Sequence, residues 1–157
     1  MAIRQIRLAG DPILYKVCKE VKKMTPMLQT LVEDMLDTMY EANGVGLAAP
    51  QVGVLKRIAV VDIGDGPFVL VNPVILEEEG EQTADEGCLS IPGKAGQVTR
   101  PNRVVMRAYD ENMLEYEVEA EELLARAFCH EVEHLDGHMY TEHVVGGLHD
   151  AEFDDEK

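Results

Sequence analysis

The segment AFCHEVEHLDG, residues 127–137, contains the pattern His-Glu-x-x-His. If it is helical, residues four apart lie on the same face, so His130 and His134 can direct imidazole nitrogens at one metal ion. Glu131, about 100° further round the helix, can reach a water on that metal without being a ligand. Two histidines on an acidic surface helix would give the same pattern without a metal. The segment therefore predicts a helix, and a metal site there needs a third ligand.

The chain has 157 residues, of which 46% are hydrophobic, and this predicts a single domain over residues 1–157 with a buried core. Its net charge of −16 disfavours a broad surface for phosphate backbones, so no direct nucleic-acid binding is expected. No apolar run approaches the ~18 residues of a bilayer span, and the N-terminus has no signal-peptide core. We expect a cytoplasmic monomer without a membrane segment, with an acidic, frayed tail from about residue 150 to 157.

The first half of the chain contains a clear helix pattern. Thr25 and Pro26 are typical of the N-cap and first position of a helix, and apolar residues then recur three and four apart as far as Met39. The pair Asn43-Gly44 tolerates the positive φ values at which helices end. We therefore predict an N-terminal amphipathic helix with one face on the core.

Short strands are predicted in the middle of the chain, from runs rich in Val and Ile and from alternation of apolar with charged residues. The four predicted strands are residues 57–63, 68–76, 103–109 and 113–120. The charge run at 77–81 is interpreted as a solvated turn, and residues 85–93 as a loop with Cys88 at its centre. The predicted class is α+β, with short antiparallel β-sheets packed around a central helix that carries His-Glu-x-x-His.

Three completions of the metal site can be compared. The metzincin extension needs a histidine at position 140, which is Tyr140 here. A thermolysin-like glutamate would need a second helix, and residues 135–157 show no convincing helical pattern. The Cys88 thiolate remains, and His₂Cys with an open fourth position suits a catalytic divalent metal. Cys18 and Cys129 are interpreted as ordinary buried thiols, since three widely spaced cysteines do not predict a disulfide framework.

A second unusual segment, GVGLAAPQVG at residues 44–53, alternates glycines with small apolar residues around one long polar side chain, Gln51. It lacks the ending of a phosphate-binding loop and the preceding strand of a dinucleotide fingerprint. A tight turn between a helix and a strand would explain it equally well. Alternatively, the glycines let a ligand backbone approach closely, and Gln51 donates a hydrogen bond into a cleft.

Three segments together, GVGLAAPQ at 44–51, EGCLS at 86–90 and HEVEHLDG at 130–137, resemble the signature motifs of peptide deformylases in their order and spacing. The resemblance covers nearly the whole chain. It implies a metal-dependent hydrolase that removes the N-formyl group from the N-terminal formyl-methionine of nascent polypeptides and releases formate. The implied partners are formyl-methionyl nascent peptides emerging from the ribosome.

The resemblance also implies roles for individual residues. It implies one divalent metal ion, Fe(II) in the cell, at a site that Zn or Ni can also occupy. The implied metal ligands are Cys88, His130 and His134. Glu131 would be the general base, while Gln51 and the backbone N–H of Leu89 would form the oxyanion hole. Gly46 would offer its main chain to the substrate.

Specificity is expected to come from the same helix. Counting back from the first motif histidine places Leu123 and Ala127 on its metal side. With Val45 they are predicted to form an apolar pocket for the methionine side chain, and the alternative is that Leu123 and Ala127 only fill the core. Arg126 is expected to reach a carboxylate. Some family members carry a peptide-anchoring arginine after EGCLS, where this chain offers Lys94, which lacks the bidentate fork of arginine.

Two other functions remain open from the residues alone. A small zinc protease would cleave internal peptide bonds rather than N-formyl groups. A protein that uses the His₂Cys site only to hold its fold would close it with a fourth ligand, such as Glu131 or His138.

Overall fold

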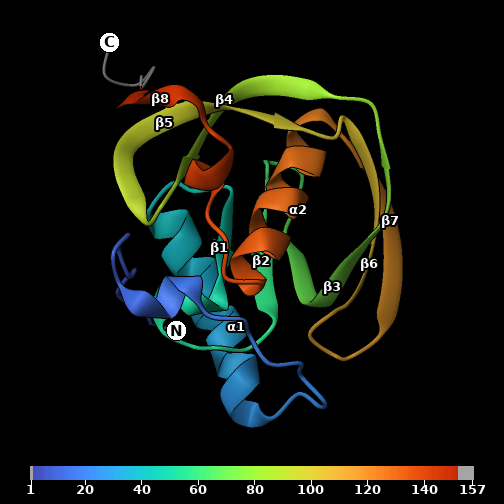
Figure 1. Cartoon of the computed structure of the whole chain (residues 1–157). Coiled ribbons are helices and arrows are strands. Elements are labelled where there is room, and N and C mark those ends of the chain that lie inside the picture. Colours follow the sequence, from blue (N-terminus) through green and yellow to red (C-terminus); the bar gives the residue numbers. More distant parts are fainter. Residues whose placement is uncertain (1, 152–157) are drawn as a thin grey trace.

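The computed structural model describes residues 2–151, which fold into antiparallel sheets and two α-helices (Figure 1). The strands are β1 (Gly46–Ala48), β2 (Ile58–Val61), β3 (Phe68–Glu79), β4 (Gln82–Cys88), β5 (Ile91–Arg100), β6 (Arg103–Tyr109), β7 (Glu115–Glu121) and β8 (Val145–Asp150). The helices are α1 (Pro26–Glu41) and α2 (Glu122–Leu135), with 3-10 turns η1 (Pro12–Tyr15), η2 (Ala49–Val52) and η3 (Tyr140–His143). One sheet has the order β1-β2-β3-β6-β7 and the other β4-β5-β8. The predicted α+β class with antiparallel sheets is confirmed.

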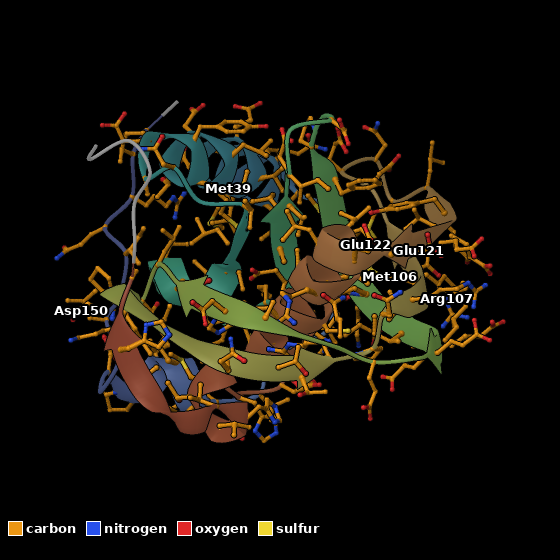
Figure 2. All side chains as sticks on the ribbon, turned by 90° about the horizontal axis from the view of Figure 1, so that it is seen from above. Met39, Met106, Arg107, Glu121, Glu122 and Asp150 are labelled. Atoms are coloured by element: carbon orange, nitrogen blue, oxygen red, sulfur yellow. The ribbon has the colours of Figure 1, made fainter. Side chains whose placement is uncertain are left out.

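A helix covers each face of the five-stranded sheet, and this explains why β2 is buried at every position. Ala59 packs in a cluster with Phe128 of α2, whereas its neighbour Ile58 packs in a second cluster with Met35 of α1. Successive side chains of a strand point to opposite faces, so a strand between two helices is apolar throughout. Figure 2 labels one methionine of each cluster, Met39 on α1 and Met106 on β6.

The ends of α1 follow from local chemistry. Thr25 is the N-cap, and its side chain accepts a hydrogen bond from the backbone N–H of Leu28 at 3.2 Å. Asn43, two residues past the last helical residue, has a φ of 59°. Neither α-helix of residues 2–151 has the length and apolar character that a membrane span requires.

Two segments predicted as turn or loop are largely strand, so those predictions are wrong over residues 77–79, 85–88 and 91–93. The charge run continues β3 as far as Glu79, which pairs with Arg103 of β6, and the turn follows at Gly80. The segment around Cys88 is the tight end of a hairpin: Cys88 is the last residue of β4 and pairs with Ile91 of β5. Most side chains in these strand segments are exposed, so they lack the apolar alternation of a half-buried strand.

The strand β8 is likewise absent from the prediction, because all six of its residues are exposed and carry no apolar pattern. It pairs with β5, where Lys94 lies opposite Asp150, and the Lys94 Nζ lies 2.6 Å from Asp150 Oδ1. The tail predicted to fray from about residue 150 is therefore ordered at Asp150, and the Ala151 N–H still donates to the Gly93 carbonyl at 2.9 Å. The rest of that predicted tail, residues 152–157, lies outside the described residues.

Candidate metal centre and active site

The two motif histidines lie one turn apart on α2, and both are buried, with His134 only 1% exposed. The helix ends before Gly137, which has a φ of +84°. A Cβ at Gly137 would lie 2.8 Å from the carbonyl oxygen of Tyr15, so the chain can turn beside η1 only with glycine there. This end of α2 is therefore packed closely against the N-terminal segment.

The sulfur of Cys88 meets the two histidines at the end of β4. Its Sγ lies 3.3 Å from Nε2 of His134, and one ligand atom each from Cys88, His130 and His134 lie within 4.8 Å of one another. Across residues 2–151, no other set of His, Cys, Asp and Glu side chains forms such a group of three. A thiolate with two imidazoles is a donor set that divalent transition metals bind readily.

One ring nitrogen of each histidine is available to a metal. Nδ1 of His130 lies 2.5 Å from Oε2 of Glu86, and since a carboxylate only accepts, Nδ1 carries the proton and Nε2 is left for a metal. Nε2 of His134 faces Cys88, while its buried Nδ1 has no hydrogen-bond partner within the described chain. Burial lowers the pKa of His134 well below its ordinary value, so this ring is neutral, the form that binds metal.

The electrostatic surroundings favour a cation at this point. Burial opposes a charge on His130, but its contacts with Cys88 and Glu86 raise its pKa well above the ordinary value. Anionic groups that stabilise a proton on an imidazole also stabilise a metal cation bound to it. The residues present therefore fit a divalent metal ion.

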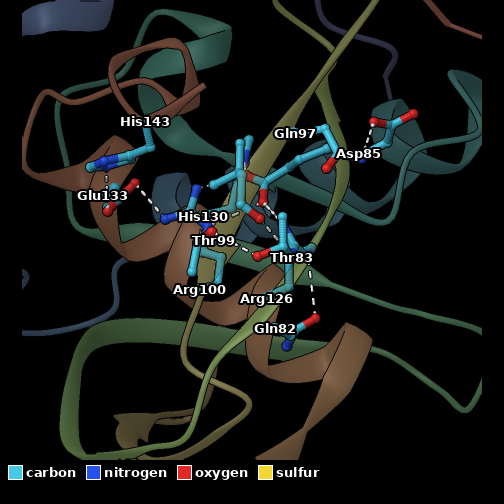
Figure 3. Close-up of polar contacts among 12 residues, drawn as sticks. Gln82, Thr83, Asp85, Gln97, Thr99, Arg100, Arg126, His130, Glu133 and His143 are labelled. Atoms are coloured by element: carbon cyan, nitrogen blue, oxygen red, sulfur yellow. Dashed lines mark hydrogen bonds and ion pairs between the residues drawn. The ribbon is translucent and has the colours of Figure 1, made fainter. Parts of the chain in front are cut away.

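Glu86 lies in a buried ion-pair network with Arg100, Arg126 and His130, and these three partners are labelled in Figure 3. Arg100 donates to Glu86 through Nε at 3.1 Å and Nη2 at 2.6 Å, and Arg126 donates through Nη1 at 2.7 Å. Burial would raise the pKa of Glu86, but His130 and Arg100 hold it well below its usual value, so it remains a carboxylate. Arg126 thus has the carboxylate partner expected from the sequence.

Glu131 is 3% exposed and lies at the wall of the same site. Its Oε1 is buried without a hydrogen-bond partner among residues 2–151, and burial raises its pKa to about 7. A carboxylate that is poorly solvated and close to neutrality in its pKa is suited to take up and return a proton. Its other oxygen faces Gly46 of β1, where the missing side chain leaves room for it.

The amide of Gln51 joins the glycine segment to the hairpin that carries Cys88. Its Oε1 accepts from the Ala48 N–H at 2.9 Å, and its Nε2 donates to Ser90 Oγ at 3.0 Å and lies 3.4 Å from Cys88 Sγ. The orientation of the amide is therefore set on both sides, and its N–H group is directed toward the proposed metal ligands.

A cavity of about 280 Å³ brings most of the predicted site residues together. Those that line it are Val45, Gly46, Gln51, Cys88, Leu89, Leu123, Ala127, His130 and Glu131. Val45 and Leu123 are 45% and 48% exposed, so they are apolar groups at its rim rather than core. Cys129 lines a separate cavity of about 510 Å³ with Val132 and Glu133, so it faces away from the metal ligands. Lys94, which was considered as a peptide anchor, ion-pairs with Asp150 on β8.

Sequence reasoning missed the roles of Glu86, Arg100 and Ser90. Glu86 precedes Cys88 by two residues, but the register of β4 with β5 is irregular between them, so strand periodicity does not place the two side chains on one face. Arg100 lies far along β5, so no local pattern connects it with the site.

Comparisons with known proteins give one consistent result. Residues 3–148 match the family model of polypeptide deformylase. A peptide deformylase of Agathobacter rectalis is 66% identical over 155 residues, covering 99% of this chain and 98% of the relative, and one of Lachnoclostridium phytofermentans is 59% identical over 160 residues, covering 100% and 98%. The crystal structure of peptide deformylase from Thermotoga maritima has a TM-score of 0.90 at 39% identity, covering 92% of this chain and 99% of that chain.

Proposed function

The chain belongs to the peptide deformylase family, and we propose that Cys88, His130 and His134 bind its metal and that Glu131 is its general base. The enzyme is a metal-dependent hydrolase that removes the N-formyl group from nascent polypeptides. The observation that carries the residue assignment is the approach of three ligand atoms to within 4.8 Å of one another beside a buried carboxylate.

The proposed ion is Fe(II) in the cell, with Zn or Ni able to occupy the same ligands. A bound divalent ion supplies a Lewis acid for the formyl oxygen and lowers the pKa of a coordinated water to about 7. One thiolate and two neutral imidazoles leave such a site with a net charge of +1, so the ligand set does not neutralise the cation. The hydrogen bond from His130 to Glu86 fixes which nitrogen that ring presents.

Glu131 is proposed to move the proton. It takes a proton from the attacking water as the oxygen bonds to the formyl carbon, and it gives that proton to the amine nitrogen as the C–N bond breaks. The products are formate and a free N-terminal methionine. Glu131 suits this role because its buried Oε1 has no partner within residues 2–151 that would compete for the proton.

Gln51 and the backbone N–H of Leu89 are proposed as the oxyanion hole. The bond from the Ala48 N–H holds the Gln51 amide so that its Nε2 faces the site, and Leu89 follows Cys88 in the turn of the hairpin. One such donor typically contributes ~10²–10³ in rate. Gly46 is proposed to present its main chain to the substrate, since it lies at the cavity wall on β1.

The methionine side chain is proposed to bind among Val45, Leu123 and Ala127. All three line the cavity, and the first two are half exposed although apolar. A methionine side chain laid on them would remove that apolar surface from water, and its flexible thioether adapts to such a wall.

The setting of the enzyme is part of the proposal. We infer one catalytic domain over residues 1–157, monomeric and cytoplasmic, organised around α2 as the central helix with α1 as an amphipathic helix beside it. The net charge of −16 supports a body that makes no direct contact with nucleic acid. Its partners would then be the formyl-methionyl peptides themselves as they leave the ribosome.

Formate release from formyl-Met-Ala-Ser by wild type and by Glu131→Gln tests the assignment. The variant keeps the shape of the side chain and is expected to keep its metal but to lose turnover by ~10²–10⁴. Undiminished turnover would refute Glu131 as the base. Incubation with acetyl-Met-Ala-Ser and with longer unformylated peptides distinguishes a zinc protease, which would cut internal bonds.

A further inference from the structure

The proposed metal ligands come from one strand and one helix. The packing of α2 on β4 must therefore set the distance between the sulfur and the two imidazoles. Cys88 belongs to β4, whereas His130 and His134 belong to α2. Glu86 lies two residues before Cys88 and connects the two elements. Its Oε1 accepts from Arg126 Nη1 at 2.7 Å and its Oε2 from His130 Nδ1 at 2.5 Å. Each oxygen of one carboxylate is thus held by a different residue of α2.

The spacing of these residues makes the contact a two-point attachment. Arg126 and His130 are four residues apart, on one face of α2, and Glu86 lies two residues before Cys88, with a register irregularity of β4 between them. With His130 alone on Glu86, this part of α2 would be joined to β4 through one bond only. The bond from Arg126 adds a second point of attachment one turn earlier on α2, beside the core packing of Phe128 and the contact of Arg100 with Glu133.

Arg126 makes further contacts with the same hairpin. Its Nη2 donates to the carbonyl of Val98 on β5 at 2.9 Å, and its Nε donates to Gln82 Oε1 on β4 at 3.4 Å. The residue is 5% exposed, and each of its three side-chain nitrogens has a protein partner. Although Arg126 lines the active-site cavity, its guanidinium is engaged in holding the fold rather than directed at a ligand.

Arg100 cannot replace Arg126 in this arrangement. It lies on β5, in the same hairpin as Glu86, so its two bonds to Glu86 brace the hairpin internally. It reaches α2 through Glu133 at 2.8 Å, on the outer side of the helix where Glu133 also contacts His143. Arg100 and Arg126 balance Glu86 and Glu133 in charge. Loss of Arg126 would leave this group with one net negative charge beside His130, with Arg100 still paired to Glu86.

We propose that Arg126 is a positioning residue of the metal centre. It holds α2 against β4 so that two imidazoles and the sulfur of Cys88 remain within reach of one ion. The inference rests on the ligand set proposed above and goes beyond it, because Arg126 is neither a ligand nor a substrate contact. Partners that orient metal ligands typically change metal affinity by about 10–100-fold.

Arg126→Met and Arg126→Lys test this, with Arg103→Met as the matched control. Arg103 also ion-pairs with several glutamates, Glu77, Glu79 and Glu119, but on the five-stranded sheet away from the centre. The zinc-loaded proteins are mixed with a chromophoric chelator and the rate of zinc release is followed. We expect Arg126→Met to release zinc about 10–100-fold faster than wild type. Arg126→Lys should fall between, since lysine can pair with Glu86 but cannot bond Val98 and Gln82 at the same time. The control should match wild type.

Further readouts separate positioning from a general loss of stability. Thermal unfolding of the metal-free forms first gives a temperature at which every variant is folded, and zinc release is compared at that temperature. The visible spectra of the Co(II) forms are then compared. Positioning predicts altered Co(II) bands and a reduced kcat with a KM near that of wild type. Unchanged release and bands in Arg126→Met overturn the proposal, as does a raised KM with unchanged release. If Arg126→Met does not fold, the same comparison with Arg126→Lys decides.

Cys88→Ser in the same assay separates this inference from the proposed function. If it holds zinc as tightly as wild type, the ligand set is wrong and the inference fails with it. If it loses zinc while Arg126→Met and wild type release zinc at the same rate, only the role of Arg126 is refuted.

Discussion

The carboxylate of Glu131 lies in the space that a side chain at position 46 would need. A Cβ built on Gly46 would lie 2.3 Å from Oε2 and 2.9 Å from Cδ of Glu131. Both distances are far inside van der Waals contact, and Glu131 is too buried to swing into solvent. A side chain at position 46 would therefore displace the Glu131 carboxylate, so the glycine of β1 determines where this carboxylate of α2 lies.

Gly46→Ala should displace Glu131 and impair catalysis while leaving the metal in place. The methyl group must push the carboxylate aside, and a displacement of about 1 Å in a catalytic group can reduce the rate ~10²-fold. Steady-state formate release and metal content, measured on the same preparation, check this. A variant with the activity of wild type would show that the position of the Glu131 carboxylate is not critical.

Cys88→Ala should abolish metal retention, and Cys129→Ala should not. The two thiols differ in what they face, since Cys88 lies against His134 and Cys129 lines a cavity on the other side of α2. Burial also raises the pKa of the Cys129 thiol to about 12, which disfavours the thiolate that a metal binds. Metal analysis after dialysis of anaerobically purified protein distinguishes them. Equal retention by the two variants would remove Cys88 from the ligand set.

Gln51→Glu should lower kcat by ~10²–10³ with a smaller effect on KM, because it removes one donor to the developing oxyanion and adds a repelling charge. Gln51 also bonds to Ala48 and Ser90, so the thermal midpoint of the variant is measured alongside. Ser90→Ala serves as the control, since it removes the partner of Gln51 without removing the donor. If both variants lose activity equally, the effect is due to packing rather than to the donor.

Ala127→Phe should fill the predicted methionine pocket. Ala127 lines the cavity with little exposure, so a phenyl ring there would occupy the space assigned to the substrate side chain. The value of kcat/KM for formyl-Met-Ala-Ser should fall by about 10-fold or more, a loss comparable to that of a misfitted apolar group. The corresponding formyl-Ala peptide should be affected far less. Equal losses for both peptides would place the methionine elsewhere.

The elements that pack one face against the core were the ones predicted correctly from the sequence. The strand predicted at residues 103–109 has the bounds of β6, where Val104, Met106 and Ala108 alternate into the core. Most residues of β4 and all residues of β8 are not buried. Neither strand therefore shows the alternation of apolar and polar residues by which a strand is predicted. The helix between Thr25 and Asn43 was recognisable because its cap, its apolar stripe and its end agree.

The part of the site that lies on one helix could be predicted from the sequence. His130, His134 and Glu131 share one helical motif, so their relative positions follow from local geometry. Cys88 was reached only by excluding other third ligands, because its approach to His134 depends on how α2 packs on a hairpin. Glu86 was missed, since its contact with His130 joins residues 44 positions apart and no local rule predicts it.

X-ray absorption at the zinc edge of the zinc-loaded protein tests the metal centre most directly. The arrangement of Cys88, His130 and His134 predicts one sulfur at about 2.3 Å, two imidazole nitrogens at about 2.0–2.1 Å and one further light atom in the open position. A first shell without sulfur, or one with a third imidazole closing the site, would contradict it.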